Sequence, residues 1–281
     1  MPPQSLAAAL AAGALLLAPA AADAANVRLF PSERLYPHYT ADPRSPEFGM
    51  ALLRVPDPEV PDSGANRVGL KLGGRFGLFR VHREGEPDGG WQLDIHAGFL
   101  GQFDLAHSLD NIGWDGTYGF LASTRLGRGV SLQLGTKHVS AHVGDEYAER
   151  TGRRRLGYTR EEAAAGLAWS DARGARLYGE AGWSYRVKRE LGQERGRLQS
   201  GAELHRPFRA RERLGWYAAA NLETMQEQDW RLDSSLHLGL SVPAGDRRWR
   251  LGVALYDGRM ALGELFLFDE SSVAVGLWLE P

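Results

Sequence analysis

The 281-residue chain contains no cysteine, so disulfide bonds and thiolate metal sites are excluded. It also lacks long hydrophobic runs: the mean hydropathy is −0.35, and beyond its first residues the chain has no apolar stretch of about 20 residues, the length that a membrane-spanning helix needs. No charge sign dominates, since the formal net charge is −2. This balance argues against a nucleic-acid-binding protein, because that class is typically basic.

The first 24 residues differ in composition from the rest of the chain. Residues 6–22 form a short apolar run rich in Ala and Leu, and Ala22 and Ala24 supply the small residues of a cleavage site. The leading segment has no Lys or Arg, so only the terminal amine gives it positive charge. We interpret residues 1–24 as a secretory signal that is cleaved after Ala24.

Residues 25–47 are rich in proline, with Pro31, Pro37, Pro43 and Pro46. Proline lacks the N–H group that helices and sheets require, so this stretch predicts an irregular arm, which we place in the periplasm. Residues 48–281 are predicted to form one further domain. The whole chain contains 35 Gly, 8 Trp and 9 Tyr, and no second domain is indicated.

Alternation of apolar and polar residues is the main signal from residue 48 onward. Near the end of the chain, for example, Trp249, Leu251 and Val253 alternate with Arg248 and Arg250. Period-two alternation indicates strands with one apolar and one polar face. A soluble sandwich gives the same pattern over segments of about five to six residues. Here the segments reach about ten residues, the length of a tilted strand that crosses a membrane.

We therefore predict an all-β fold, a transmembrane antiparallel β-barrel of about twelve strands, located in the bacterial outer membrane. The first strand is placed at residues 48–55. The connections that then fall on one side are short, at residues 126–129, 170–174 and 243–247. Those on the other side are long, at residues 105–114, 143–157, 224–231 and 257–270. Short periplasmic turns and long outer loops are typical of such barrels. A soluble exported sandwich remains the alternative fold.

Chemically active side chains gather on one predicted hairpin. Gln133 and Lys137 are assigned to the lumen, so His138, Ser140 and His142 belong to the lipid-facing side. If the hairpin closes between residues 143 and 158, Ser140 lies opposite Glu161.

This set of residue types suits acyl transfer. A serine hydroxyl is a poor nucleophile until an imidazole takes its proton, and a carboxylate can orient that imidazole. We predict Ser140 as the nucleophile, His138 as the base and Glu161 as the orienting group. His142, Asp145 and Glu146 are the alternative acids or bases.

Less specific interpretations of the same residues stay open. Polar side chains at the end of a strand commonly lie at the membrane interface, and Glu161 could pair with an arginine of the loop at residues 150–155. That arginine-rich loop is a solvated surface or a site for anionic headgroups or lipopolysaccharide. Asp145 and Glu146 are candidate calcium ligands, because calcium prefers carboxylate oxygens; no other cofactor is expected.

Four segments carry a resemblance to a known family: QLDIHAGFLGQF (92–103), LDNIGWDG (109–116), HVSAHVGDEY (138–147) and YTREE (158–162). The chain resembles an uncharacterised family of bacterial outer-membrane barrels, a domain of unknown function, over nearly its whole mature length. The resemblance implies the barrel and supplies no activity.

A looser similarity is to the outer-membrane phospholipase A and lipid A deacylase families. Both place a His-x-Ser pair on the outer surface of a barrel strand, with a third orienting residue about a dozen positions further on. His138 and Ser140 match the pair, whereas no Asn directly follows Ser140, and Glu161 lies further along the chain than the third residue of those families.

The function predicted from the sequence is an outer-membrane barrel that acts as a serine-dependent hydrolase of lipid acyl esters. The alternative is a non-catalytic barrel, either a narrow pore or a structural protein. The expected partners are membrane lipid, including lipopolysaccharide, and the outer-membrane assembly machinery; nucleic acid is not expected.

Overall fold

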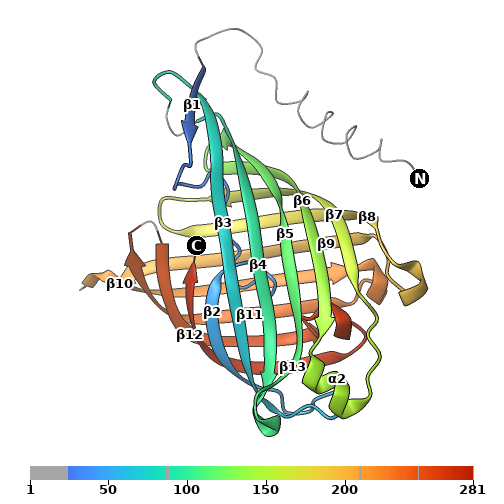
Figure 1. Cartoon of the computed structure of the whole chain (residues 1–281). Helices are drawn as coiled ribbons and strands as arrows, with labels where there is room; N and C mark the ends of the chain where they lie inside the picture. The colour runs from blue at the N-terminus through green and yellow to red at the C-terminus, as the bar shows by residue number, and fades with distance from the viewer. Residues whose placement is uncertain (1–24, 87–88, 209–210, 246, 281) are drawn as a thin grey trace.

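The computed structural model describes residues 25–86, 89–208, 211–245 and 247–280, and the predicted export signal lies outside these ranges. The described strands form a 13-stranded antiparallel sheet in which β2 to β13 follow one another in order. Pairing of β3 with β4 and of β2 with β13 closes these twelve strands into a barrel (Figure 1). The predicted fold is confirmed. No helix in the described part of the chain is both long and apolar enough to span a membrane.

The strands, in chain order, are β1 (Ala25–Leu29), β2 (Phe48–Arg54), β3 (Asn66–Arg83), β4 (Trp91–Asp104), β5 (Asp110–Gly127), β6 (Val130–Val143), β7 (Thr159–Ser170), β8 (Ala175–Arg186), β9 (Gly196–Phe208), β10 (Arg211–Met225), β11 (Leu232–Ala244), β12 (Arg247–Arg259) and β13 (Asp269–Glu280). Within the described ranges, one helix, α2 (Asp145–Thr151), and four short 3-10 turns lie in the connections. The first barrel strand therefore begins at Phe48, as predicted. β1 is not one of the twelve barrel strands; it pairs with the last residues of β3, from Phe79 to Arg83.

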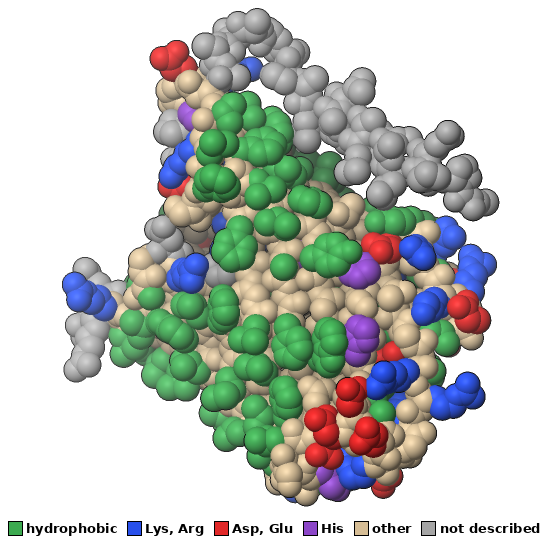
Figure 2. All heavy atoms as spheres, viewed as in Figure 1, with side chains coloured by type: hydrophobic (Ala, Val, Ile, Leu, Met, Phe, Trp, Pro, Cys, Tyr) green, Lys and Arg blue, Asp and Glu red, His purple; other side chains and the backbone are tan. Residues whose placement is uncertain are grey.

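Exposed and buried side chains alternate along the strands. The apolar side chains are the exposed ones and the charged side chains are the buried ones, which is the reverse of a soluble protein. Leu251 and Val275 are more than half exposed on the outside, whereas Arg250, between two exposed neighbours, is completely buried in the lumen. Figure 2 shows the same arrangement on one side of the barrel, where hydrophobic side chains cover the wall and charged ones gather near α2. This distribution suits a wall that contacts lipid and an interior that is polar.

The two ends of the barrel differ in their connections. One end, which we call the turn end, has tight connections such as those after β5 and β7. The other, the loop end, carries α2 and the long connection between β12 and β13 (Figure 1). The connection at residues 260–268 is a loop with a single 3-10 turn, as expected from the sequence.

The proline-rich arm runs inside the barrel, a position that the sequence did not predict. The Tyr39 ring stacks on Tyr178 of β8 with 3.8 Å between ring centroids. The Thr40 backbone N–H donates to Glu203 of β9 at 2.7 Å. Glu47 accepts hydrogen bonds from Lys71 and Arg250, and all of its surface is buried. The arm therefore provides counter-charges and ring contacts for the inner wall.

Ion pairs occupy much of the remaining lumen. Arg197 of β9 contacts the carboxylates of Glu162, Glu180 and Glu223, which come from three other strands. Buried charges persist only when they are paired and hydrogen-bonded, because desolvation is costly. The inward-facing charges therefore hold the strands together across the lumen, and a cavity of about 170 Å³ remains between the arm and the wall.

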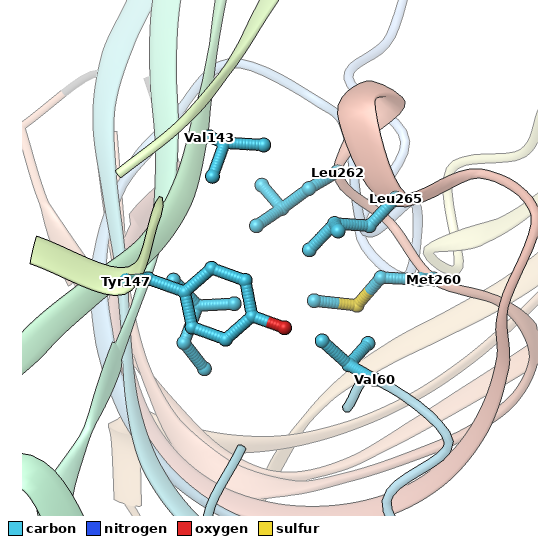
Figure 3. Packing of buried hydrophobic residues seen from close by; sticks show 7 residues of the cluster. Val60, Val143, Tyr147, Met260, Leu262 and Leu265 are labelled. Atoms are coloured by element: carbon cyan, nitrogen blue, oxygen red, sulfur yellow. The ribbon is translucent and has the colours of Figure 1, made fainter. Parts of the chain in front are cut away.

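Loops pack together to cover the loop end. Seven residues form a buried hydrophobic cluster there (Figure 3): Val60, Ile112, Val143, Tyr147, Met260, Leu262 and Leu265. Beside it, the buried carboxylate of Glu264 accepts backbone N–H groups from Leu156, Gly157 and Tyr158. The loop that follows α2 is thereby fastened to the loop between β12 and β13. With the arm in the lumen, this packing argues against an open pore.

Candidate active site

Strand β6 carries the predicted chemistry on its outer face. His138 and Ser140 are partly exposed and His142 is exposed, whereas the intervening Val139 packs inward with a buried cluster and Ala141 is buried. Alternation along the strand therefore places all three polar side chains on the outside, as expected. They lie in the half of β6 nearer the loop end.

His138 is held by a neighbour on each side. Its Nδ1 lies 2.7 Å from Oε1 of Glu161, the residue directly opposite it on β7. Its ring stacks on Tyr118 of β5, with 4.4 Å between centroids. Because Nδ1 is engaged by the carboxylate, Nε2 is the nitrogen left to accept a proton. This is the arrangement in which a carboxylate fixes the tautomer of a histidine base.

The predicted register of this hairpin was wrong by two residues. Ser140 lies opposite Thr159, and it is His138 that lies opposite Glu161. The hairpin closes where the Ala141 N–H donates to the Tyr158 carbonyl, before the strand β6 ends. Residues beyond this point pair only with β5 and lead into α2. Because the loop between β6 and β7 is longer than predicted, each residue of β6 lies opposite a residue of β7 two positions earlier than predicted.

Ser140 contacts the other histidine. Its Oγ lies 3.1 Å from Nε2 of His142, two residues further along the strand. The His142 ring stacks on Trp114 of β5, with 4.3 Å between centroids. Ser140 is thus brought close to an imidazole, and in the described part of the chain its hydrogen bond goes to His142 instead of His138. Glu161 is paired with His138 and not with Ser140.

In the described part of the chain, no hydrogen bond or ion pair joins Glu161 to the arginine-rich loop. Its second carboxylate oxygen lies 3.4 Å from the Tyr185 hydroxyl of β8. Arg150 instead donates to Asp110, and Arg155 pairs with Asp145. Among the described residues, the pairing of Glu161 with a loop arginine, one of the open interpretations, is not found.

The alternative acids lie away from the serine. Asp145 and Glu146 form the first turn of α2 and are exposed to solvent. Asp145 pairs with Arg155, so its charge is already offset. Across the described ranges, no group of three or more His, Asp or Glu side chains is placed to hold a metal ion. The calcium site proposed at Asp145 and Glu146 thus has two carboxylates and no third ligand of these types.

The two aromatic partners were not anticipated. Trp114 lies directly opposite His142, and Tyr118 lies directly opposite His138. The sequence does contain a signal for these pairs. Trp114 and Tyr118 share a face of their strand and are four residues apart, as His138 and His142 are. Cross-strand pairs of this kind restrict ring orientation. The aromatic rings therefore position both imidazoles along the outer wall.

The fold and site together define a membrane β-barrel that carries a serine, two histidines and a carboxylate on its outer wall. The chain belongs to the family described as "Protein of unknown function (DUF1207)", whose model matches residues 13–271. No curated protein matches the sequence.

Solved structures with a similar fold include two bacterial phospholipases. Outer membrane phospholipase A from Escherichia coli has a TM-score of 0.59 and 11% identity, over 84% of this chain and 92% of that one. The Salmonella typhi outer membrane phospholipase dimer with bound calcium has a TM-score of 0.58 and 12% identity, over 88% and 95%. LpxR from Salmonella typhimurium is more distant, with a TM-score of 0.43 and 10% identity over 84% and 100%. At these identities the likeness concerns the fold alone.

Proposed function

We propose that this protein is a bacterial outer-membrane enzyme that hydrolyses acyl esters of membrane lipids, with Ser140 as nucleophile. The observation that carries the proposal is the His138–Glu161 pair, at 2.7 Å, on the same outer face as Ser140. A serine, an imidazole and a carboxylate in this relation are the parts of a serine hydrolase site. The loop end then faces outward and the turn end faces the periplasm.

The proposed reaction begins with attack of Ser140 Oγ on the ester carbonyl carbon. His138 Nε2 takes the hydroxyl proton and returns it to the departing alcohol, while Glu161 stabilises the charged imidazolium. Water then hydrolyses the acyl-serine, and His138 again acts as base. Side-chain rotation about χ1 moves the serine hydroxyl among staggered positions, so Ser140 can leave His142 and turn toward His138.

Lipid is the substrate class that this position favours. The site lies on a wall whose other outward side chains are largely hydrophobic, including the half-exposed Phe120 and Leu167. An ester bond between headgroup and acyl chains reaches such a site from within the bilayer. Two proteins of similar fold are named as outer membrane phospholipases, which adds support for a phospholipid substrate.

Activity measurements on single variants test the proposal. The purified barrel, incubated with phospholipid and with lipid A in mixed micelles, is expected to release fatty acid detectable by mass spectrometry. Ser140→Ala and His138→Ala should each reduce the rate by at least about 1,000-fold, and the double variant should lose no more, because the pair acts as a unit. Glu161→Gln should slow hydrolysis less severely.

His142 provides the discriminating comparison. If His138 is the base, His142→Ala changes the rate only a few-fold; the reverse ranking would assign the base to His142, the present partner of Ser140. Thr136→Ala, on the same outer face of β6, is a matched control that should retain full activity. Release of no fatty acid by the folded wild-type protein from either lipid would contradict the proposal.

The second candidate is a non-catalytic structural barrel. The observation that favours it is the position of both histidines in aromatic stacks on an otherwise hydrophobic wall, where such rings also serve as interfacial anchors. A conducting role is less well supported, because the arm and its ion pairs occupy the lumen. In the structural case, none of the variants above has an activity to lose.

A further inference from the structure

A wide cavity opens at the turn end of the barrel, apart from the candidate active site. Its volume is about 890 Å³, and its floor is the segment of the arm at residues 32–38. The walls come from the turn-end parts of β5, β6, β8, β12 and β13. We call this cavity the vestibule. Five arginines line it: Arg34, Arg125, Arg176, Arg247 and Arg248.

Among the described residues, neither Arg34 nor Arg247 forms an ion pair with a carboxylate, whereas the other charges of the vestibule are at least partly offset. Two glutamates line the vestibule, and one of them, Glu33, already pairs with Arg28 outside it at 3.0 Å. The other, Glu280, lies 3.6 Å from Arg248. Arg176 is matched by Glu203 of the lumen at 2.8 Å. Arg34 and Arg247 therefore leave positive charge in the vestibule, in a chain whose overall charge is −2.

Arg34 occupies the position where a counter-charge is most needed. It lines both the vestibule and the smaller cavity inside the barrel, so it stands between them. Burial, together with the neighbouring Arg75 and Arg247, lowers the pKa of the Arg34 guanidinium to about 10, and Glu280 and Asp94 offset this only in part. An anion bound beside Arg34 and Arg247 would relieve both the desolvation and the repulsion.

We propose that the vestibule binds a phosphate-bearing anion, with Arg34 and Arg247 as its main contacts. The planar guanidinium group donates paired hydrogen bonds that match phosphate oxygens. The volume of the vestibule falls within the range of about 300–1,000 Å³ typical of small-molecule sites, so it holds a group larger than a single inorganic phosphate. The phosphate belongs either to a soluble molecule or to a lipid headgroup at the inner rim. The site is independent of the proposed hydrolase.

Binding of inorganic pyrophosphate tests the soluble source. Isothermal titration calorimetry of the full-length folded protein in zwitterionic detergent at low salt should show saturable binding that weakens as salt rises. Arg34→Gln and Arg247→Gln should each weaken it at least tenfold, whereas Arg34→Lys should lose less. Arg83→Gln removes an exposed arginine at the end of β3, outside the vestibule, and should leave binding unchanged. Unheated gel mobility confirms that each variant is folded.

Retention of anionic lipid tests the other source. The same proteins are equilibrated with micelles that contain phosphatidylglycerol and phosphatidylcholine, and the lipid that remains bound is measured after gel filtration. Enrichment of phosphatidylglycerol that Arg34→Gln abolishes, without pyrophosphate binding, assigns the vestibule to a headgroup. The proposal is overturned if the wild-type protein binds neither probe, or if Arg34→Gln and Arg83→Gln behave alike with both.

Discussion

Single polar residues at key positions connect parts of the chain that are far apart in sequence. Glu264 accepts three consecutive backbone N–H groups of the loop after α2, about a hundred positions earlier in the chain. Its surface is almost completely buried, so no solvent replaces these bonds. Without this carboxylate, the three N–H groups would lack good hydrogen-bond acceptors in a buried region, which lowers the stability of the loop.

Replacing Glu264 by Gln should therefore loosen the loop. The amide keeps one acceptor oxygen and presents an NH₂ group to backbone donors, so we expect a local loss of about 1–3 kcal/mol. Limited trypsin digestion should cut after Arg153, Arg154 or Arg155 several-fold faster than in the wild-type protein. Glu190→Gln alters an exposed carboxylate of another loop-end connection and should have no effect. Equal cleavage rates in the two variants would contradict a clamping role.

The outward position of His138, Ser140 and Glu161 follows from the alternation of their own strands, so the sequence predicts it. The alternation does not predict which side chain each of these residues contacts. Both histidines are two positions from Ser140 on one face, and alternation alone cannot choose between them. The cross-strand pairing depends on where the hairpin closes, and beyond that point the chain leads into α2, whose Tyr147 belongs to the buried cluster at the loop end. Local sequence patterns do not contain that information.

Among the elements, the strands are much easier to predict than the arm. A strand of about ten alternating residues carries its own signal. The arm has no periodicity, and its position depends on single contacts to distant residues, such as Thr40 with Glu203 and Tyr39 with Tyr178. The prolines predict irregular structure correctly, but they do not indicate that the segment lies in the lumen. Charged residues of the inner wall form ion pairs with the arm, as Arg250 does with Glu47.

Truncation of Tyr39 to Ala should show that the arm stabilises the barrel. The variant loses the stack on Tyr178 and leaves a void, which for a large aromatic side chain costs about 3–5 kcal/mol. Urea unfolding, followed by gel mobility, should shift to lower denaturant concentration. Tyr39→Phe keeps the ring and loses only the hydroxyl contacts with Tyr36 and Glu180, so it should retain most of the stability. No difference between Tyr39→Ala and wild type would mean that the arm is dispensable.

In contrast to a soluble globular protein, the barrel has apolar side chains on its outer wall and charged side chains in its interior. This arrangement is stable only when lipid or detergent covers the wall, and the difference between the turn end and the loop end makes the two orientations in a membrane distinguishable. We expect the loop end to face the cell exterior, because long connections are typical of the outer side of such barrels.

Cysteine labelling tests this orientation without background, since the chain has no cysteine of its own. Glu149→Cys in α2 should react with an impermeant maleimide on intact cells. Arg173→Cys, in the tight connection after β7, should react only after the cells are broken. The reverse pattern would mean that the barrel is inserted the other way or that the assignment of its ends is wrong.

The molecule as a whole keeps its charged network inside and its candidate chemistry outside, and Ser140 is the residue at which the proposed hydrolase function can be tested. The most direct test is treatment of the folded protein in micelles with a fluorophosphonate ester, followed by peptide mass spectrometry. We expect one adduct, on Ser140, that is absent after prior incubation with lipid and absent from His138→Ala. The absence of an adduct on Ser140 in the folded protein, or equal labelling of the His138→Ala variant, would contradict a serine nucleophile activated by His138.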